Sequence, residues 1–151
     1  PPPKPAAKPR LAALLAPDIQ ASLVEVRDYD DRSVIVIRGD GFFEPASAEV
    51  AERVKPLLGR IAAALNELPG PVRITGHTDN QAIRSLRYPS NWHLSQERAE
   101  AVKALLGATV KADRLQAEGR ADTEPVEDNS TPAGRARNRR VEITLAASPN
   151  S

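Results

Sequence analysis

The sequence predicts an α/β fold in which helices cover one face of a β-sheet. Two observations support this prediction. Short runs rich in β-branched residues alternate along the chain with longer segments whose apolar residues recur at helical spacing. Glycine, proline, asparagine and aspartate separate these segments, as expected at turns. A folded part of about 120 residues is long enough for one domain with its own hydrophobic core.

The amino-terminal part is expected to be a linker followed by a short helical lead-in. Residues 1–9 contain five prolines together with Lys4 and Lys8, which favours polyproline II structure and a semi-rigid tether. Within residues 10–21, Pro17 is expected to break or restart an amphipathic helix. This helix should pack on the edge of the domain or contact an upstream part of the protein. Its apolar residues are Leu11, Leu14, Leu15 and Ile19.

The main domain is predicted to span residues 22–146 and to begin with a hairpin. The runs 23–26 and 34–37 are rich in β-branched residues, and the acidic segment 28–31 separates them. The second run is apolar throughout, which predicts a central strand covered on both faces. A helix follows, with Pro56 marking a kink or a new start, and should cover one face of the sheet. Its apolar residues are Val50, Val54, Leu57, Leu58, Ile61 and Leu65.

The second half of the domain is predicted to supply three strands and one helix. Strands are expected at 72–76, near 115–117 and at 141–145, and the last of these should close the sheet. Ser95 is the predicted N-cap of the intervening helix, and Gly107 is its predicted stop. The remaining segments are predicted to be irregular: a long loop at 120–134 and a disordered tail at 147–151.

Composition excludes several classes of function. The chain has 21 basic and 20 acidic residues, so its net charge of +1 gives no general attraction to nucleic acid or membranes. It has no cysteine, which excludes disulfides and thiolate chemistry. No apolar run reaches the roughly 20 residues of a bilayer span, and the chain begins at Pro1 rather than methionine. We therefore expect a fragment of a longer protein whose membrane anchor lies upstream.

A candidate ligand site lies where a strand ends and a helix begins. Asp79 follows the strand at 72–76, and α/β sheets usually hold ligands beyond the carboxyl ends of strands. Arg98 falls in the first turn of the helix predicted from Ser95, where the helix dipole disfavours a cation by roughly 0.3 to 1 kcal/mol. A carboxylate bound there by Arg98 and by free backbone N–H groups would offset this cost, and Asp79 would accept an ammonium group of the same ligand. The pair therefore suits a zwitterion, and a structural Asp79–Arg98 salt bridge is the alternative.

Metal-dependent and hydrolytic functions fit the sequence less well. A zinc site at His77, Asp79 and His93 would be short of ligands, and the chain has only two histidines. We expect no metal or other cofactor, and we expect His77 to hydrogen-bond within the turn and to position Asp79. Hydrolysis would need a second carboxylate beside Asp79, a Ser-His-Asp signature or a cysteine nucleophile. The motif contains none of these, so we expect a protein that is not an enzyme.

Nucleic-acid binding is also disfavoured, although arginines cluster at positions 135, 137, 139 and 140. Acidic residues between 118 and 128 lie just upstream and balance their charge. The cluster also lacks the aromatic residues that stack on single-stranded bases. We expect part of the cluster to be structural and Arg139 to reach the ligand site.

Four motifs occur in order along the chain. They are Gly76-His77-Thr78-Asp79, Asn91-x-x-Leu94-Ser95-x-x-Arg98-Ala99, Arg114-Leu115 with Gly119, and Asn129-x-Thr131-x-x-Gly134-Arg135-Ala136-x-Asn138-Arg139-Arg140-Val141-Glu142. Together they resemble the OmpA C-terminal-domain family, which binds peptidoglycan. The resemblance covers residues 34–145 and implies a β/α/β/α/β sandwich with a mixed sheet.

The resemblance also implies a pocket for the diaminopimelate residue of the peptidoglycan stem peptide. Asp79 and Arg98 correspond to the family's aspartate and helix arginine, which take the ammonium and the carboxylate of diaminopimelate. Asn91 corresponds to the asparagine at the helix start, and Arg139 to the first arginine of the Asn-Arg-Arg run. The expected neighbours in the pocket are Thr78, Asn80 and Leu94.

Two segments depart from the plain outer-membrane members of the family. The stretch 80–90 looks longer and resembles the branch that contains flagellar stator proteins and type VI secretion proteins. With residues 11–19, it most resembles the periplasmic extension of TssL proteins, inner-membrane components of the type VI secretion system. Ala46 stands where many relatives have glycine or asparagine, which alters an expected backbone contact to the ligand. The aromatic residues of these segments are expected either to wall the stem peptide or, as favoured, to pack on the core: Phe42, Phe43, Tyr88 and Trp92.

The resemblance implies non-catalytic peptidoglycan binding that anchors a membrane-embedded secretion complex to the cell wall. The expected location is the periplasm of a Gram-negative bacterium, in a protein anchored in the inner membrane. The expected partners are the stem peptide, other components of the complex and, as in stator-like relatives, a second copy in a homodimer. The alternatives are a protein-interaction or structural module with a degenerate pocket, or a stator-type wall anchor of a motor.

Overall fold

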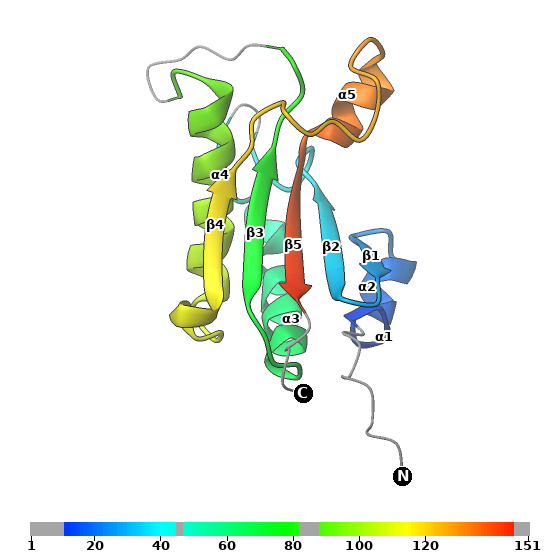
Figure 1. The fold of residues 1–151 in the computed structure, drawn as a ribbon, viewed down its shortest axis with the longest axis vertical. Helices are drawn as coiled ribbons and strands as arrows, with labels where there is room; N and C mark the ends of the chain where they lie inside the picture. Colours follow the sequence, from blue (N-terminus) through cyan, green and yellow to red (C-terminus); the bar gives the residue numbers. More distant parts are fainter. Residues whose placement is uncertain (1–10, 45–46, 82–87, 147–151) are drawn as a thin grey trace.

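A five-stranded mixed sheet forms the centre of the molecule (Figure 1). The computed structural model describes residues 11–44, 47–81 and 88–146. The strands are β1 (Glu25–Asp28), β2 (Arg32–Arg38), β3 (Val72–His77), β4 (Leu115–Gly119) and β5 (Arg140–Ala146). Their order across the sheet is β1-β2-β5-β3-β4, and the β3–β4 pair alone among them is parallel. The predicted α/β fold with a mixed sheet is confirmed.

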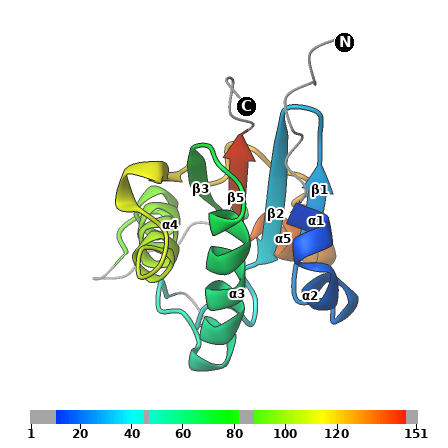
Figure 2. The ribbon, with the colours of Figure 1, turned by 90° about the horizontal axis from the view of Figure 1, so that it is seen from below.

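The two long helices, α3 (Lys55–Asn66) and α4 (Asn91–Leu106), pack side by side on the same face of the sheet, as the end-on view in Figure 2 shows. The lead-in helices α1 (Leu11–Leu14) and α2 (Ala16–Gln20) lie beside β1 on that side. A short helix, α5 (Pro132–Asn138), lies beyond the end of the sheet. Two 3₁₀ turns complete the fold, η1 (Glu52–Val54) and η2 (Ala112–Arg114). None of the helices in the described part of the chain has the length and hydropathy that a membrane span requires.

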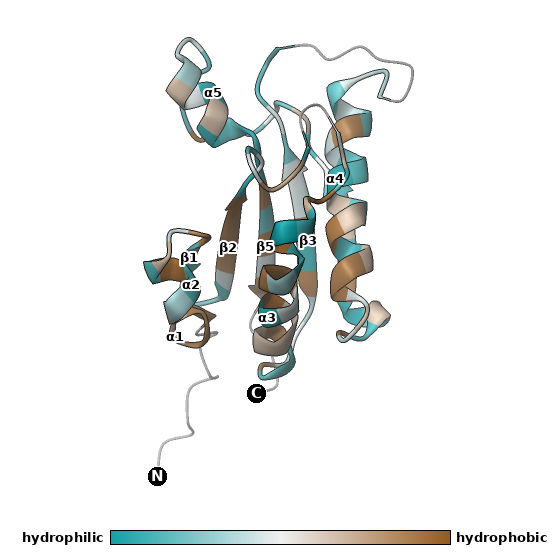
Figure 3. Cartoon of the chain, turned by 180° about the vertical axis from the view of Figure 1, so that it is seen from behind, coloured by the Kyte–Doolittle hydropathy of each residue, from teal (hydrophilic) through white to brown (hydrophobic). Residues whose placement is uncertain are grey.

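The core lies between the sheet and α3 and α4. Alternate residues of each strand point toward the helices, and on β2, β3 and β5 most of these side chains are apolar and buried. Figure 3, which views the sheet from the helix side, shows β2 largely in brown and brown bands along α3 and α4. The residues of β2, β3 and β5 that form this layer are Ile35, Ile37, Val72, Ile74, Val141, Ile143 and Leu145.

The prediction that β2 is a central strand covered on both faces holds only in part. Val34 and Val36 point away from α3 and α4 toward a face that these helices do not cover, where Val34 is buried and Val36 is half-buried. The last strand closes the sheet as predicted, because β5 lies between β2 and β3 and pairs antiparallel with both. Local pattern predicts a strand but does not give its neighbours, which depend on long-range pairing.

α4 begins one turn earlier than predicted. Ser90 is the N-cap, and its hydroxyl accepts a hydrogen bond from the His93 backbone N–H at 3.3 Å. Ser95 lies inside the helix and is fully buried, where its hydroxyl donates to the Trp92 carbonyl and accepts from the Ala121 N–H. Arg98 is therefore about two turns into the helix, and the argument that placed it in the first turn was wrong. The predicted end is confirmed, since α4 stops at Leu106 with Gly107 as its cap.

Two glycines allow α4 to approach the sheet closely. A Cβ on Gly76 of β3 would overlap the Ser95 carbonyl, and one on Gly119 of β4 would lie 2.5 Å from the Gln96 backbone nitrogen. The glycines of the predicted site motifs therefore set the distance between α4 and the strand that ends near Asp79.

The loop after β4 is partly helical. α5 begins inside the loop predicted at 120–134, so residues 132–134 are helical instead, with Thr131 as N-cap and Pro132 in the first turn. Asn138 is fully buried and supports the preceding loop: its side-chain oxygen accepts from the Val126 and Glu127 N–H groups at 2.8 and 3.0 Å. Asn138 thus has a structural role.

Proline positions follow the predictions. Pro17 lies in the first turn of α2, so the lead-in helix restarts there, and Pro56 lies in the first turn of α3. Asp18 of α2 is 5% exposed and forms an ion pair of 2.7 Å with Arg60 of α3, which holds the lead-in against the domain. The predicted linker 1–9 and tail 147–151 lie outside the described residues.

Candidate functional site

Asp79 lies just beyond the end of β3, as predicted, and is buried at 6% exposure. The preceding Thr78 fixes the backbone by donating its N–H to the Ala121 carbonyl at 2.8 Å. The Thr78 hydroxyl donates to the Asp79 carbonyl at 2.8 Å. One side-chain oxygen of Asp79, Oδ1, accepts from the Gln81 N–H at 3.0 Å, which closes a local turn. The other oxygen, Oδ2, remains for a charged partner.

Arg139 is that partner. Its Nη1 donates to Asp79 Oδ2 at 2.6 Å, while its Nε and Nη2 donate to the two oxygens of Asp40 at 2.9 and 2.8 Å. One guanidinium therefore joins two carboxylates, and its hydrogen bonds with Asp40 and Asp79 raise the pKa of Arg139. The hydrogen bonds from Arg139 likewise lower the pKa of Asp40. The predicted alternative of an Asp79–Arg98 salt bridge is not formed among the described residues.

Arg98 lies beside this network and is buried at 6% exposure. Its Nε donates to the Ser47 carbonyl at 2.8 Å, and its guanidinium carbon lies 4.8 Å from the centre of the Phe43 ring. Within the described residues it has no carboxylate at ion-pair distance. Burial lowers the pKa of Arg98, and the charges of Asp40 and Asp79 act against this shift. The site therefore holds a buried cation, Arg98, that forms no ion pair with the described residues.

Gly39 brings the two arginines together. Its N–H donates to the Arg139 carbonyl at 2.7 Å. A Cβ at this position would lie 3.0 Å from that carbonyl oxygen and 3.5 Å from Arg98 Nη1. Any larger residue would crowd the space between Arg98 and Arg139, so the turn after β2 is part of the site.

The remaining predicted site residues have different positions. Asn91 starts α4 and donates to the Gln81 carbonyl at 3.0 Å, so it ties the helix start to the loop after Asp79. Leu94 is buried in a small cluster with Ala48 and Tyr88, one turn before Arg98 on the same helix. Asn80, which directly follows Asp79, is exposed. Asn91, Leu94 and Arg98 follow helical spacing and share one face of α4.

The aromatic residues divide between packing and exposure. Phe42 and Phe43 are buried with their rings 5.0 Å apart, and the hydroxyl of buried Tyr88 accepts from the Ala48 N–H at 3.0 Å. Trp92 is 53% exposed. A wall of four aromatic residues is not formed, because three of them pack inward. The predicted effect of Ala46 lies outside the described residues.

His77 does not make the hydrogen bond predicted for it. It is 3% exposed, and within the described residues its Nδ1 has no hydrogen-bond partner. The carboxylates of Glu124 and Glu142 lie 4.0 and 3.8 Å from its ring nitrogens. Burial lowers the pKa of His77 to about 4, and the charge of Arg140 adds to this effect. His77 points to the sheet face opposite the helices, because strand residues alternate, and so does not position Asp79.

The arginine cluster is divided among four environments. Arg135 donates to the Asn129 carbonyl at 3.0 Å, and Arg140 is buried with Glu142 at 2.6 Å. Arg137 lines a cleft on the open sheet face, whereas Arg139 reaches Asp79. The described residues contain no group of His, Cys, Asp and Glu side chains that could hold a metal ion.

Sequence reasoning missed Asp40, Gly39 and Ser47. Asp40 is separated by 99 residues from its partner Arg139, and Ser47 contributes a backbone carbonyl that no side-chain pattern reveals. One signal was present: the apolar pattern of β2 stops at the Gly39-Asp40-Gly41 turn, as that of β3 stops before Asp79.

The chain is similar to known proteins in both sequence and structure. The OmpA family matches residues 42–139, which include Asp79, Arg98 and Arg139. A solved structure described as the cell wall anchor of the type VI secretion system from Pseudomonas aeruginosa is 58% identical, with a TM-score of 0.90. The match covers 94% of this chain and 100% of that one.

Two curated relatives match with lower identity. Motility protein B of Bacillus subtilis is 34% identical over 125 residues, which is 81% of this chain and 48% of the relative. Peptidoglycan-binding protein ArfA of Mycobacterium tuberculosis is 38% identical over 91 residues, 59% of this chain and 27% of the relative. The chain spans about half the length of the curated relatives that it matches first.

Proposed function

The chain belongs to the OmpA family, and from that premise we propose that it binds peptidoglycan without turnover and anchors a membrane-embedded secretion complex to the cell wall. The family match and the similarity to a cell wall anchor of a type VI secretion system support this proposal. A relative named for peptidoglycan binding supports it further. The binding site proposed is the network of Asp79, Arg98 and Arg139.

The buried guanidinium of Arg98 is the observation that carries the proposal. A charged group removed from water is costly unless an opposite charge compensates it. Arg98 has one hydrogen bond and an aromatic face among the described residues, but no carboxylate. A ligand carboxylate would supply the missing charge and would receive the two Nη groups as a planar fork.

Diaminopimelate of the stem peptide fits the site because its free end is a zwitterion. Its carboxylate would bind Arg98, and its ammonium group would bind Asp79. Asp79 Oδ2 is engaged by Arg139 in the free protein. The ammonium group would therefore share or replace that hydrogen bond, while Asp40 keeps Arg139 in place through its two remaining contacts. Thr78, Asn80, Asn91 and Leu94 would shape the surroundings.

The proposed location is the periplasm, in a protein anchored in the inner membrane of a Gram-negative bacterium. The other components of the secretion complex are the proposed partners, and a homodimer would double the attachment to the wall. The similarity to motility protein B keeps a motor anchor as the alternative complex.

A protein-interaction module is the second candidate function. The hydrogen bond between Arg139 and Asp79 favours it, because Arg139 already neutralises the Asp79 carboxylate that the ligand ammonium group would need. In that case the network would stabilise the domain, and the protein would not bind the cell wall.

Co-sedimentation with insoluble peptidoglycan tests the proposal. The purified chain is compared with an Asp79→Ala, Arg98→Ala variant, after circular dichroism has shown that both are folded. We expect the chain to sediment with the wall and the variant to remain in solution. An exposed acid–base pair far from the site, Lys111→Ala with Asp113→Ala, is the matched control and should behave like the unchanged chain.

Free meso-diaminopimelate should compete with the wall, whereas cadaverine, which has the two amino groups of diaminopimelate but neither carboxylate, should not. No sedimentation of the unchanged chain would favour the protein-interaction module. Sedimentation that survives the double substitution would place the wall contact elsewhere. Release of soluble muropeptides by the purified chain would contradict binding without turnover.

A further inference from the structure

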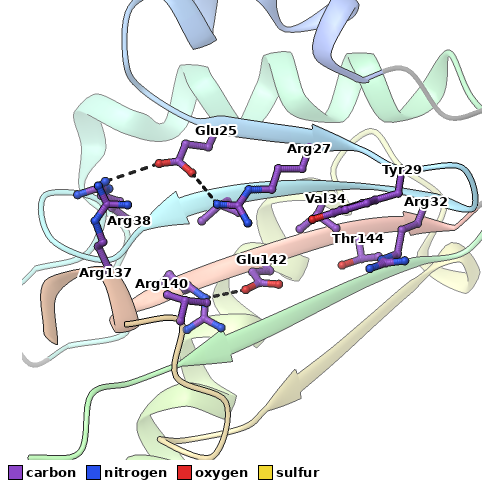
Figure 4. Close-up of a pocket in the computed structure, with 12 residues that line it drawn as sticks. Glu25, Arg27, Tyr29, Arg32, Val34, Arg38, Arg137, Arg140, Glu142 and Thr144 are labelled. Atoms are coloured by element: carbon purple, nitrogen blue, oxygen red, sulfur yellow. Dashed lines mark hydrogen bonds and ion pairs between the residues drawn. The ribbon is translucent and has the colours of Figure 1, made fainter. Parts of the chain in front are cut away.

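A cleft lies on the face of the sheet opposite α3 and α4. It has a volume of about 190 Å³ and lies across β1, β2 and β5, with contributions from α5 and the loop before it (Figure 4). Val34 and Val36 of β2 form its floor, because their side chains alternate with those of the core. Tyr29 lies at one end with the Arg32 guanidinium 4.3 Å from the centre of its ring. The cleft therefore has an apolar floor.

Arginines surround this floor. Five arginines and two glutamates line the cleft, an excess of three positive charges in a chain whose net charge is only +1. Arg38, Arg137 and Arg140 gather at the end away from Tyr29, as Figure 4 shows. Arg32, at the Tyr29 end, is paired with Asp31 outside the cleft at 2.8 Å. The unbalanced charge therefore lies at the Arg38 end and along β1.

The two glutamates do not neutralise the arginines one for one. Glu25 lies between Arg27 and Arg38, at 3.7 and 3.6 Å, and so shares one negative charge between two guanidinium groups. Glu142 is held by the buried Arg140 at 2.6 Å. Among the described residues Arg137 has no ion-pair partner. Arg27 and Arg38 are about half exposed, with 60% and 51% of their side-chain surface accessible, and can bind an incoming anion without a change in the fold.

An open face of an antiparallel sheet is usually polar and solvated. This face differs because valines occupy its centre and arginines its rim, the distribution typical of a protein interface. A chain of phosphates would gain nothing from the valine floor and would meet the two glutamates. A peptide can place aliphatic side chains on the valines and carboxylates against the arginines.

We propose that this cleft docks an acidic and aliphatic peptide segment of a partner protein. The segment lies along β2 with its aliphatic side chains on Val34 and Val36 and its carboxylates toward Arg38 and Arg137. Arg139 and Arg140 are consecutive and point to opposite sides of the sheet, one to Asp79 and the other to the cleft. The partner and the wall ligand can therefore bind at the same time, and the two proposals fail independently.

Fluorescence anisotropy with a labelled peptide of alternating glutamate and valine tests the docking cleft. We expect saturable binding at low ionic strength that weakens as salt screens the charges. Arg27→Glu with Arg137→Glu should reduce the affinity by about tenfold or more. Lys103→Glu with Lys111→Glu, on the other side of the sheet, changes the net charge equally and should alter the affinity by less than about twofold.

A milder protein variant and a peptide without charge serve as further controls. The milder Arg27→Gln, Arg137→Gln variant should bind with intermediate affinity, and both cleft variants should still sediment with peptidoglycan if the wall site is intact and the domain folded. Replacing glutamate by glutamine in the peptide should abolish binding. The proposal is overturned by no binding of the acidic peptide, by equal losses in the cleft and control variants, or by preferred binding of sodium polyphosphate.

Discussion

Asp79 is bonded to Arg139 and not to Arg98. The Arg139 Nη1 atom lies 2.6 Å from Asp79 Oδ2, whereas Arg98 contacts the Ser47 carbonyl and the Phe43 ring. The carboxylate proposed for the ligand ammonium is thus occupied, and the guanidinium proposed for the ligand carboxylate is available. This asymmetry leads to separate predictions for the two halves of the site.

Asp40→Asn should weaken the binding of free meso-diaminopimelate by about tenfold. Asp40 holds two of the nitrogens of Arg139, and without its charge Arg139 can turn its full fork to Asp79. The ligand ammonium group would then compete with a bidentate guanidinium. Calorimetric titration measures the change, and Asp31→Asn, which removes the same charge at an exposed site, is the control. Equal or tighter binding would show that Arg139 does not compete for Asp79.

Arg98→Met should abolish wall binding while changing the free energy of unfolding by less than about 1 kcal/mol. The substitution removes a buried charge and one hydrogen bond, and it keeps contact with the Phe43 ring. Arg98→Lys should keep the charge but bind about tenfold more weakly, because an ammonium group cannot offer a planar fork. Urea unfolding and wall sedimentation test these expectations. A loss of about 3 kcal/mol with binding intact would assign Arg98 a structural role.

Gly76→Ala should destabilise the domain by about 1 to 3 kcal/mol, because its Cβ would overlap the Ser95 carbonyl and push α4 from the sheet. Gly59→Ala is the matched control. Gly59 lies in α3 with nothing within 4 Å of its Cβ position, so alanine should stabilise that helix by about 0.5 to 1 kcal/mol. Opposite signs in urea unfolding are expected, and a neutral Gly76→Ala would mean that α4 moves at no cost.

The buried His77 predicts a pH-dependent stability. Burial lowers its pKa from 6.5 to about 4 in the folded chain, so the unfolded chain takes up this proton first as the pH falls. Stability is fully present above about pH 6.5 and decreases toward about pH 4, by at most roughly 1.4 kcal/mol per pH unit. The pKa of Asp40 is lowered from its usual value of 3.8, so the contribution of Asp40 to stability changes with pH only below that value and outside this window.

His77→Gln should reduce the pH dependence of the free energy of unfolding between about pH 6.5 and about pH 4. The slope is compared rather than the absolute stability, because the substitution itself disturbs a buried position. The same slope in both proteins would assign the acid sensitivity to other groups.

Much of the fold could be predicted because its signals are local. Alternation along β3 and β5, the proline starts of α2 and α3, and the stop at Gly107 each depend on a few neighbouring residues. The start of α4 was misplaced because Ser90 and Ser95 are both suitable caps, and burial alone decides between them. α5 was missed because its Thr131-Pro132 start lies in a stretch rich in turn residues.

Short-range pattern was enough to predict that Asp79 follows a strand and that Arg98 lies on a helix, and the family resemblance was enough to predict that opposite charges share one site. Which of these charges meet depends on the three-dimensional arrangement of the strands. Arg139 reaches Asp79 across 60 residues and Asp40 across 99, because β5 lies between β2 and β3 and brings its first residues to the ends of both. The central placement of β5 also puts the buried Arg140 on the opposite face, where it lines the cleft. Strand order depends on the total burial of the core, which no segment encodes by itself.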